Sequence, residues 1–182
     1  MPNRPQNWKP HSLLSRITDD KKVRSWLTSQ GSLTLRLRQH CPDINVQVLS
    51  ESLQVPLVSE ATALNMANNE RAWVRCVLLK CHQQSWVYAR TVIPNFNPSN
   101  PWQPLQKLGN KPLGEVLYQM PSIERTPFEF CKQPLNAWPL LNSILGVYQD
   151  NPSSFARRSV FLKQASPLLL TEVFLPGLFN FY

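Results

Sequence analysis

The stretch that decides the fold is residues 72–93, AWVRCVLLKCHQQSWVYARTVI. It contains two runs of β-branched and aromatic residues, 72–81 and 85–93, and such runs are typical of β-strands. Only the short polar segment 82–84 separates them. Because a connection this short allows only antiparallel pairing, the stretch predicts a β-hairpin within an antiparallel sheet.

Further strands are expected before and after this hairpin. Residues 44–48 alternate apolar and polar side chains, and residues 124–131 form another candidate in spite of Pro127. Near the end of the chain, residues 157–163 and 168–175 are separated by a short turn and are expected to pair. The sequence thus predicts about six strands that mostly follow one another as meanders.

Helices are expected early and in the middle of the chain. Apolar residues at helical spacing predict one helix over 23–29. After a turn at Gly31, Ser32 is placed to cap a second helix, although the leucine alternation that follows also fits a strand. Residues 112–119 begin with proline, which suits a first helical turn, and a short helix is expected around 140–145. Together with an antiparallel sheet, these helices define the α+β class.

Composition and charge exclude several classes of protein. The chain has 182 residues, of which 42% are hydrophobic, so it can bury the core of one domain over 1–182, with 1–20 as an extended, proline-punctuated lead-in. The formal net charge is +8, but most of the excess lies in residues 1–40, which favours a solvated basic segment over nucleic-acid binding. No segment has the pattern of a secretory signal or the length of a membrane span. We therefore expect a cytoplasmic protein without membrane insertion and, since no interface pattern is visible, a monomer.

The cysteines indicate packed thiols. Cys41, Cys76, Cys81 and Cys131 form no Cys-x-x-Cys pair, and no histidine completes a zinc-finger spacing, so no metal site is expected. Cys76 and Cys81 lie in an apolar run, which suits reduced cysteines in a cytosolic protein.

Three charged residues are expected on apolar faces of the strands. Because side chains alternate between the two faces of a strand, Glu172, Arg75 and Arg90 each share a face with large apolar neighbours. A charge that is buried without a partner is costly. Two interpretations stay open: Glu172 forms a structural ion pair with Arg75 or Arg90, or these groups line a concave site for an anionic small molecule.

Five segments, in this order, resemble the chorismate pyruvate-lyase family. They are 73–75 (WVR), 86–94 (WVYARTVIP), 105–114 (LQKLG and KPLG), 156–159 (ARRS) and 168–176 (LLLTEVFLP). The resemblance implies a single antiparallel sheet of about six strands with helical flaps covering an internal ligand pocket. It also implies the conversion of chorismate to 4-hydroxybenzoate and pyruvate, without a cofactor, as the first step of ubiquinone biosynthesis. The first 70 residues match loosely, and residues 132–154 are longer than expected for the family.

The resemblance also implies roles for individual residues. Arg75 would hold the ring carboxylate and Glu172 would meet the ring hydroxyl, which makes these two the expected catalytic residues. Leu113 would give a main-chain contact, and Leu33 stands by loose alignment where the family has methionine.

The second carboxylate of chorismate, on the enolpyruvyl group, needs another cation. Arg90 is the candidate that the sequence offers, with Arg157 or Arg158 behind it, although the latter two otherwise read as the solvated start of a strand. The alternative function is a non-enzymatic module that binds small aromatic acids, related to the effector domains of bacterial transcription regulators.

Overall fold

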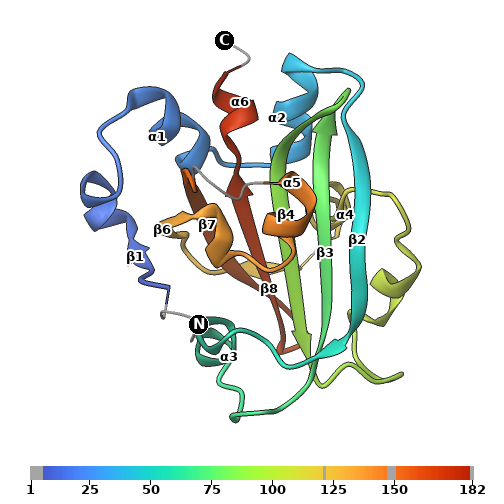
Figure 1. Ribbon diagram of the computed structural model, residues 1–182. Coiled ribbons are helices and arrows are strands. Elements are labelled where there is room, and N and C mark those ends of the chain that lie inside the picture. Colours follow the sequence, from blue (N-terminus) through green and yellow to red (C-terminus); the bar gives the residue numbers. More distant parts are fainter. Residues whose placement is uncertain (1–5, 121, 147–150, 181–182) are drawn as a thin grey trace.

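The structure, a computed structural model, describes residues 6–120, 122–146 and 151–180 (Figure 1). In this part of the chain the strands form one antiparallel sheet of eight strands, flanked by short helices. The strands are β1 (Lys9–Pro10), β2 (Asn45–Gln54), β3 (Ala72–Cys81), β4 (Gln84–Pro94), β5 (Glu124–Arg125), β6 (Glu129–Pro134), β7 (Ser153–Lys163) and β8 (Ser166–Phe174). The helices are η1 (His11–Arg16), α1 (Lys21–Thr28), α2 (Leu33–His40), α3 (Val58–Ala63), η2 (Gln103–Lys107), α4 (Leu113–Gln119), η3 (Leu135–Ala137), α5 (Leu141–Leu145) and α6 (Pro176–Phe179).

The expected α+β class with one antiparallel sheet is confirmed. The six predicted strands correspond to β2, β3, β4, β5 with β6, β7 and β8, and the one strand that was not predicted, β1, has two residues. The predicted hairpin is β3–β4, in register from Ala72 opposite Pro94 to Cys81 opposite Gln84. Its turn carries His82 at a positive φ of 52°.

The sheet is built from two three-stranded meanders. The strand order is β1-β6-β7-β8-β4-β3-β2, and β5 pairs with β7. One meander is β2-β3-β4, the other is β6-β7-β8, and the antiparallel pairing of β4 with β8 joins them. Strands from the middle and the end of the chain therefore meet at the centre of the sheet, which brings β3 and β8 to either side of β4.

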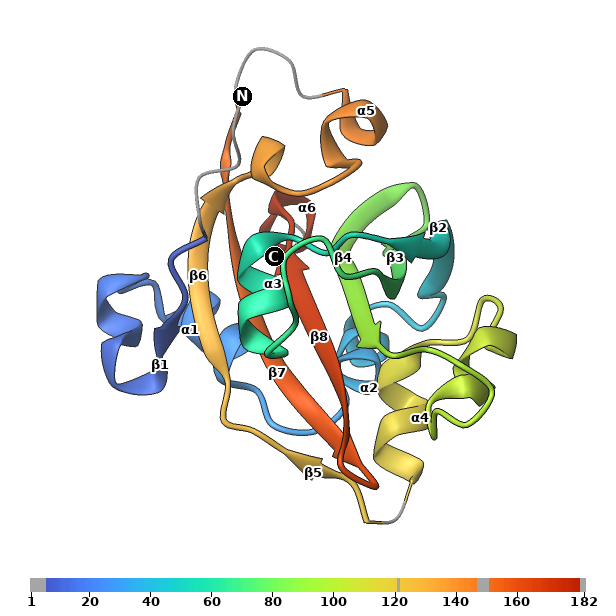
Figure 2. The same cartoon turned by 90° about the horizontal axis from the view of Figure 1, so that it is seen from below.

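Different helices cover the two faces of this sheet (Figure 2). On one face, Leu64 after α3 and Leu141 of α5 pack against β3, β4 and β8 through Cys76, Tyr88 and Val173. The other face carries two separate apolar clusters. Helices η1, α1 and α2 cover one end of it, and η2 and α4 cover the other. Between these two clusters the sheet is left with a hollow.

The early helices begin where the sequence predicts them. The Asp20 carboxylate accepts hydrogen bonds from the backbone N–H groups of Lys22 and Val23 and so caps α1. Ser32 accepts from Leu35 N at 3.4 Å and caps α2. Gly31, at a φ of 84°, makes the turn between them. The helical interpretation of the leucines after Ser32 is therefore correct, and the strand interpretation is wrong.

Two expectations about local structure need correction. Residues 1–20 are not extended throughout, because residues 11–16 form η1, which buries Leu14 in the core. The strand expected over 124–131 is interrupted and becomes β5 and β6. Pro127 lies in the break because it has no N–H to donate to a neighbouring strand.

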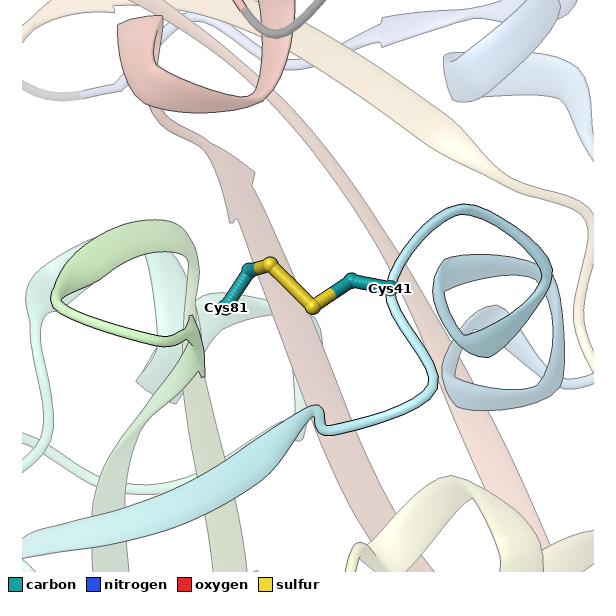
Figure 3. The surroundings of a disulfide bond; sticks show 2 residues. All are labelled: Cys41 and Cys81. Atoms are coloured by element: carbon teal, nitrogen blue, oxygen red, sulfur yellow. A yellow bond between two sulfur atoms is a disulfide. The ribbon is translucent and has the colours of Figure 1, made fainter.

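The cysteines also differ from the expectation of reduced thiols. Cys41 and Cys81 form a disulfide across 40 positions of the sequence, and both residues are buried (Figure 3). The bond links the residue that ends α2 to the last residue of β3. Alternation along a strand cannot show which buried cysteine a distant one will meet. Cys76 is free and buried, as expected, and Cys131 is free and buried as well.

No helix in the described ranges is both long enough and apolar enough to cross a membrane.

Candidate active site

A cavity of about 30 Å³ lies in the hollow between the two clusters. It is lined by Thr34, Val46, Arg75, Val77, Leu79, Ala89, Thr91, Lys111, Pro112, Leu113, Gly114, Leu170 and Glu172. This volume suits about one water molecule, whereas a cavity that accepts a benzene ring has about 150 Å³. For an aromatic ligand to bind, the helices over the cavity must move outward.

The register of the sheet places Arg75 and Glu172 on the same face. Arg75 of β3 is opposite Thr91 of β4, and Ala89, two residues before Thr91, is opposite Glu172 of β8. With one strand between them and an offset of two residues along it, the backbones of the two charged residues are about 12 Å apart. The small side chains of Ala89 and Thr91 form the floor between them, which leaves room for a flat ligand with Arg75 at one end and Glu172 at the other.

Arg75 is held by two neighbours. It is 2% exposed, and its Nη1 donates to Glu51 Oε2 at 2.7 Å while its Nη2 donates to the carbonyl of Gly109 at 2.5 Å. The register of β2 shifts between Val48 and Ser50, so Glu51 comes opposite Arg75. Simple alternation from Val46 and Val48 would turn Glu51 to the other face, which is why sequence reasoning missed this partner.

Glu172 pairs with Arg157, its direct neighbour on β7. Arg157 Nε donates to Glu172 Oε2 at 2.6 Å. The other carboxylate oxygen, Oε1, has no hydrogen-bond partner among the described residues, so it is available to a ligand in the cavity. The proposed structural ion pair of Glu172 therefore exists, but with Arg157 rather than with Arg75 or Arg90.

Arg157 also fixes the connection between the two early helices. Its Nη1 donates to the backbone carbonyls of Trp26, Leu27 and Ser29, the last at 2.6 Å. Arg157 is 1% exposed, so its interpretation as the solvated start of a strand is wrong. One buried guanidinium thus orients Glu172 and anchors the chain that leads into α2.

Arg90 does not lie in the cavity. It is opposite Cys76 in the β3–β4 register and faces α3, where its Nε and Nη2 donate to the two carboxylate oxygens of Glu60 at 2.7 and 3.1 Å. Burial alone would lower the pKa of Arg90, but the charge and hydrogen bonds of Glu60 raise it above its ordinary value. The expectation that Arg90 faces the same site as Arg75 fails because Thr91 and Ala89 are the β4 residues on that face.

Arg158 lies on this second face as well, since it follows Arg157 directly. Its Nε donates to Glu129 Oε2 at 2.8 Å, and its Nη1 donates to the carbonyl of Ser59 beside α3. Neither Arg90 nor Arg158 therefore has access to a ligand in the cavity.

Two short helices cover the cavity. Leu113, the first residue of α4, lines it. Leu33 of α2 is buried in the cluster with α1, and the cavity is lined instead by the next residue, Thr34. The helices meet where Gly114 approaches Ser32 and Thr34, so that a Cβ at this glycine would lie 3.7 Å from Ser32 Oγ.

An ion pair between Arg38 of α2 and Glu115 of α4 also connects the two helices. Helices α2 and α4 are therefore the flaps of this site, and they are joined to each other.

Cys41, Cys81 and His82 bring potential metal-ligand atoms within 4.8 Å of one another. Both sulfurs are joined in the disulfide, so the imidazole is the only donor of the three that is left. This cluster lies outside the cavity lining.

The fold resembles that of ligand-binding domains of transcription regulators. The C-terminal domain of PhnF superposes with a TM-score of 0.58 at 12% identity, covering 78% of this chain and 87% of that one. The ligand-binding domain of a putative GntR-family regulator from Bordetella bronchiseptica gives a TM-score of 0.51 at 12% identity, over 74% and 86%. At this identity the likeness concerns the fold alone. The fold that these proteins share is of the α+β class and is built on an antiparallel sheet.

Sequence comparison identifies the family. The family model described as chorismate lyase matches residues 2–181. A probable chorismate pyruvate-lyase from Hydrogenovibrio crunogenus is 42% identical over 171 residues, which cover 93% of this chain and 90% of the relative. A probable chorismate pyruvate-lyase from Nitrosomonas europaea is 33% identical and covers 97% of both chains. The chain belongs to the chorismate lyase family.

Proposed function

We propose that this protein converts chorismate to 4-hydroxybenzoate and pyruvate. The observation that carries the proposal is the placement of Arg75 and Glu172 on one face of the sheet, with the small floor residues Ala89 and Thr91 between them. A ring with a carboxylate at one end and a hydroxyl at the other matches this arrangement. Membership of the chorismate lyase family supports the same substrate.

The reaction asks little of the protein beyond positioning. The ether bond between C3 of the ring and the enolpyruvyl oxygen breaks, C4 loses its hydrogen, and the ring becomes aromatic. The enolpyruvyl fragment gains a proton at its methylene carbon and becomes pyruvate. All atoms of chorismate are found in the two products, so the balance needs no oxidant or reductant. A downhill reaction of this kind gains most from a fixed orientation of the substrate and from complementary charge.

In the proposed complex, Arg75 donates to the ring carboxylate and Glu172 Oε1 accepts a hydrogen bond from the C4 hydroxyl. Arg157 occupies Glu172 Oε2 and so fixes the direction of the free oxygen. Leu113 and Thr34 close the cavity from the two flaps. The product, 4-hydroxybenzoate, would then serve ubiquinone biosynthesis, and we propose that the protein acts as a cytoplasmic monomer.

Incubation with chorismate tests the function. Ultraviolet absorbance follows 4-hydroxybenzoate, and lactate dehydrogenase with NADH follows pyruvate. We expect both products to appear in equal amounts. A protein that binds 4-hydroxybenzoate but releases no pyruvate from chorismate would instead be the non-enzymatic aromatic-acid module that the fold likeness also allows.

Replacing Arg75 with alanine is expected to weaken 4-hydroxybenzoate binding by about 1.5–3 kcal/mol, the range for a hydrogen bond to a charged group. Isothermal titration measures this loss. Since Arg75→Ala also leaves Glu51 without its cation, Arg75→Lys is the companion variant: it keeps a charge but not the planar fork, so it should recover only part of the affinity. Unchanged affinity in Arg75→Ala would refute the placement of the carboxylate.

Replacing Glu172 with glutamine is expected to lower kcat for chorismate by about tenfold or more while 4-hydroxybenzoate binding is largely kept. The amide keeps one oxygen that can accept from Arg157 and turns its NH2 group, a hydrogen-bond donor, towards the hydroxyl, but it cannot take a proton. Steady-state kinetics together with product titration separates the two effects. Near-normal turnover would restrict Glu172 to orienting the ring and would favour direct transfer of the C4 hydrogen to the enolpyruvyl methylene.

A further inference from the structure

The charges that line the cavity are not balanced for the proposed substrate. Chorismate carries two carboxylates, and the cations among the residues that line the cavity are Arg75 and Lys111, while Arg157 lies beside the lining residue Glu172. Arg75 is already paired with Glu51, and Arg157 is paired with Glu172. Lys111 lines the cavity and has no carboxylate partner within ion-pair distance among the described residues. Its positive charge is therefore not neutralised by a carboxylate of the described residues and is available to a ligand.

The backbone places Lys111 next to the group that Arg75 binds. Residues 108–111 form a turn in which Lys111 N donates to Leu108 O at 3.1 Å and Gly109 takes a φ of 56°. The carbonyl of Gly109 accepts the hydrogen bond from Arg75 Nη2. One turn therefore holds the Arg75 guanidinium and carries Lys111 two residues further on, and both cations line the cavity.

The other basic residues near the site are committed elsewhere. Arg90 and Arg158 are on the opposite face with Glu60 and Glu129. Arg38 pairs with Glu115 between the flaps. Arg125 donates to Ser159 Oγ and to the hydroxyl of Tyr118, and it is not part of the cavity lining.

Resting on the proposed function, we propose that Lys111 binds the enolpyruvyl carboxylate of chorismate and so distinguishes this dianion from the monoanionic product. Lys111 is exposed, at the edge of the flap α4 rather than on the sheet floor. A mobile ammonium group at such a position suits the part of the substrate that must leave as pyruvate, whereas the rigid fork of a buried arginine suits the ring carboxylate that stays. Lys111 thus takes the role for which the sequence suggested Arg90.

Lys111→Met tests this role, because methionine keeps most of the length of the side chain but not its charge. We expect kcat/KM for chorismate to fall about tenfold, the scale for one partly exposed charged contact, while the Kd of 4-hydroxybenzoate changes by less than about twofold. Lys111→Arg should restore most of the loss. Lys107→Met is the matched control: this lysine is exposed on the same segment but outside the cavity lining, and its loss should change neither value.

The outcomes separate the role of Lys111 from the function itself. If wild-type protein converts chorismate and Lys111→Met does so equally well, the role is refuted and the function stands. If Lys111→Met weakens the binding of 4-hydroxybenzoate as much as it lowers kcat/KM for chorismate, Lys111 acts only by general attraction and the proposed recognition is wrong. The same conclusion follows if Lys107→Met lowers kcat/KM as much as Lys111→Met does. If wild-type protein releases no pyruvate, the proposed function fails, and the role of Lys111 fails with it.

Discussion

Glu60→Ala is expected to lower the free energy of unfolding by about 3–5 kcal/mol, the cost of leaving one member of a buried ion pair alone. The side chains of Arg90 and Glu60 are 2% and 3% exposed, so Arg90 does not face bulk water that could take over from the lost carboxylate. Glu60 also accepts from Leu57 N and thereby caps α3. Urea denaturation followed by tryptophan fluorescence measures the loss.

Glu129→Ala is the matched control for this variant. Arg158–Glu129 connects the same face of the sheet, but the Glu129 side chain is 44% exposed, and Arg158 keeps its hydrogen bond to Ser59. Its removal should cost about 1 kcal/mol or less. A loss in Glu60→Ala no larger than that of the control would contradict the burial of the Arg90 pair.

The first variant, Glu60→Ala, also decides whether Arg90 belongs to the buried ion pair or to the ligand site. Glu60→Ala, studied at a temperature where it remains folded, should bind 4-hydroxybenzoate as the wild type does, because Arg90 faces α3 and not the cavity. A folded variant that has lost product binding would return Arg90 to the ligand site.

Strand alternation in the sequence identified Arg75 and Glu172, two charged residues of the candidate site, but not the residues with which they form ion pairs. It places Arg75 and Glu172 on apolar faces because that property depends on the strand alone. Whether Arg75 and Arg90 share a face depends on the register between β3 and β4, which pairs Arg75 with Thr91. The alternation pattern carries no information on register, and a bulge such as that before Ser50 changes the face of every residue beyond it.

The flaps were predictable only in part. Ser32 and Pro112 mark where α2 and α4 begin, since capping residues act locally. That these helices meet over the cavity through Arg38 and Glu115 depends on tertiary packing between segments far apart in the sequence. The sequence showed Lys111 only as part of the segment 105–114, because an exposed lysine in a loop has no distinctive pattern until the fold places it near the Gly109 carbonyl that accepts from Arg75.

The second large effect is expected from the Cys41–Cys81 disulfide. The bond closes a loop of 40 residues, for which chain entropy predicts a stabilisation of about 4 kcal/mol. Unfolding of the protein with the bond intact and after reduction by dithiothreitol, each in urea, measures the difference. The double variant Cys41→Ser/Cys81→Ser should match the reduced wild type and show no further response to dithiothreitol, since Cys76 and Cys131 are free already.

The position of the bond gives this prediction a second readout. Cys41 ends α2, the flap that contributes Thr34 to the cavity, and Cys81 ends β3, which carries Arg75. Because the cavity must widen to admit an aromatic ring, the tether limits how far α2 can move. Hydrogen exchange in α2 should therefore quicken on reduction, while the centre of β3, which is paired on both sides, changes little.

Counting the free thiols decides whether the disulfide is present. On this point the predicted cytoplasmic location and the structure disagree, because the cytosol keeps most cysteines reduced. Protein unfolded without reductant should react with iodoacetamide at Cys76 and Cys131 and leave Cys41 and Cys81 unmodified. Alkylation of all four cysteines would overturn the tether, and with it both the stabilisation of about 4 kcal/mol and the slow exchange of α2. If the bond is present in protein isolated under alkylating conditions, the flap works against a covalent restraint at the end of α2. We then expect opening at its other end, where Gly31 turns the chain between Ser29, which Arg157 holds, and the start of α2.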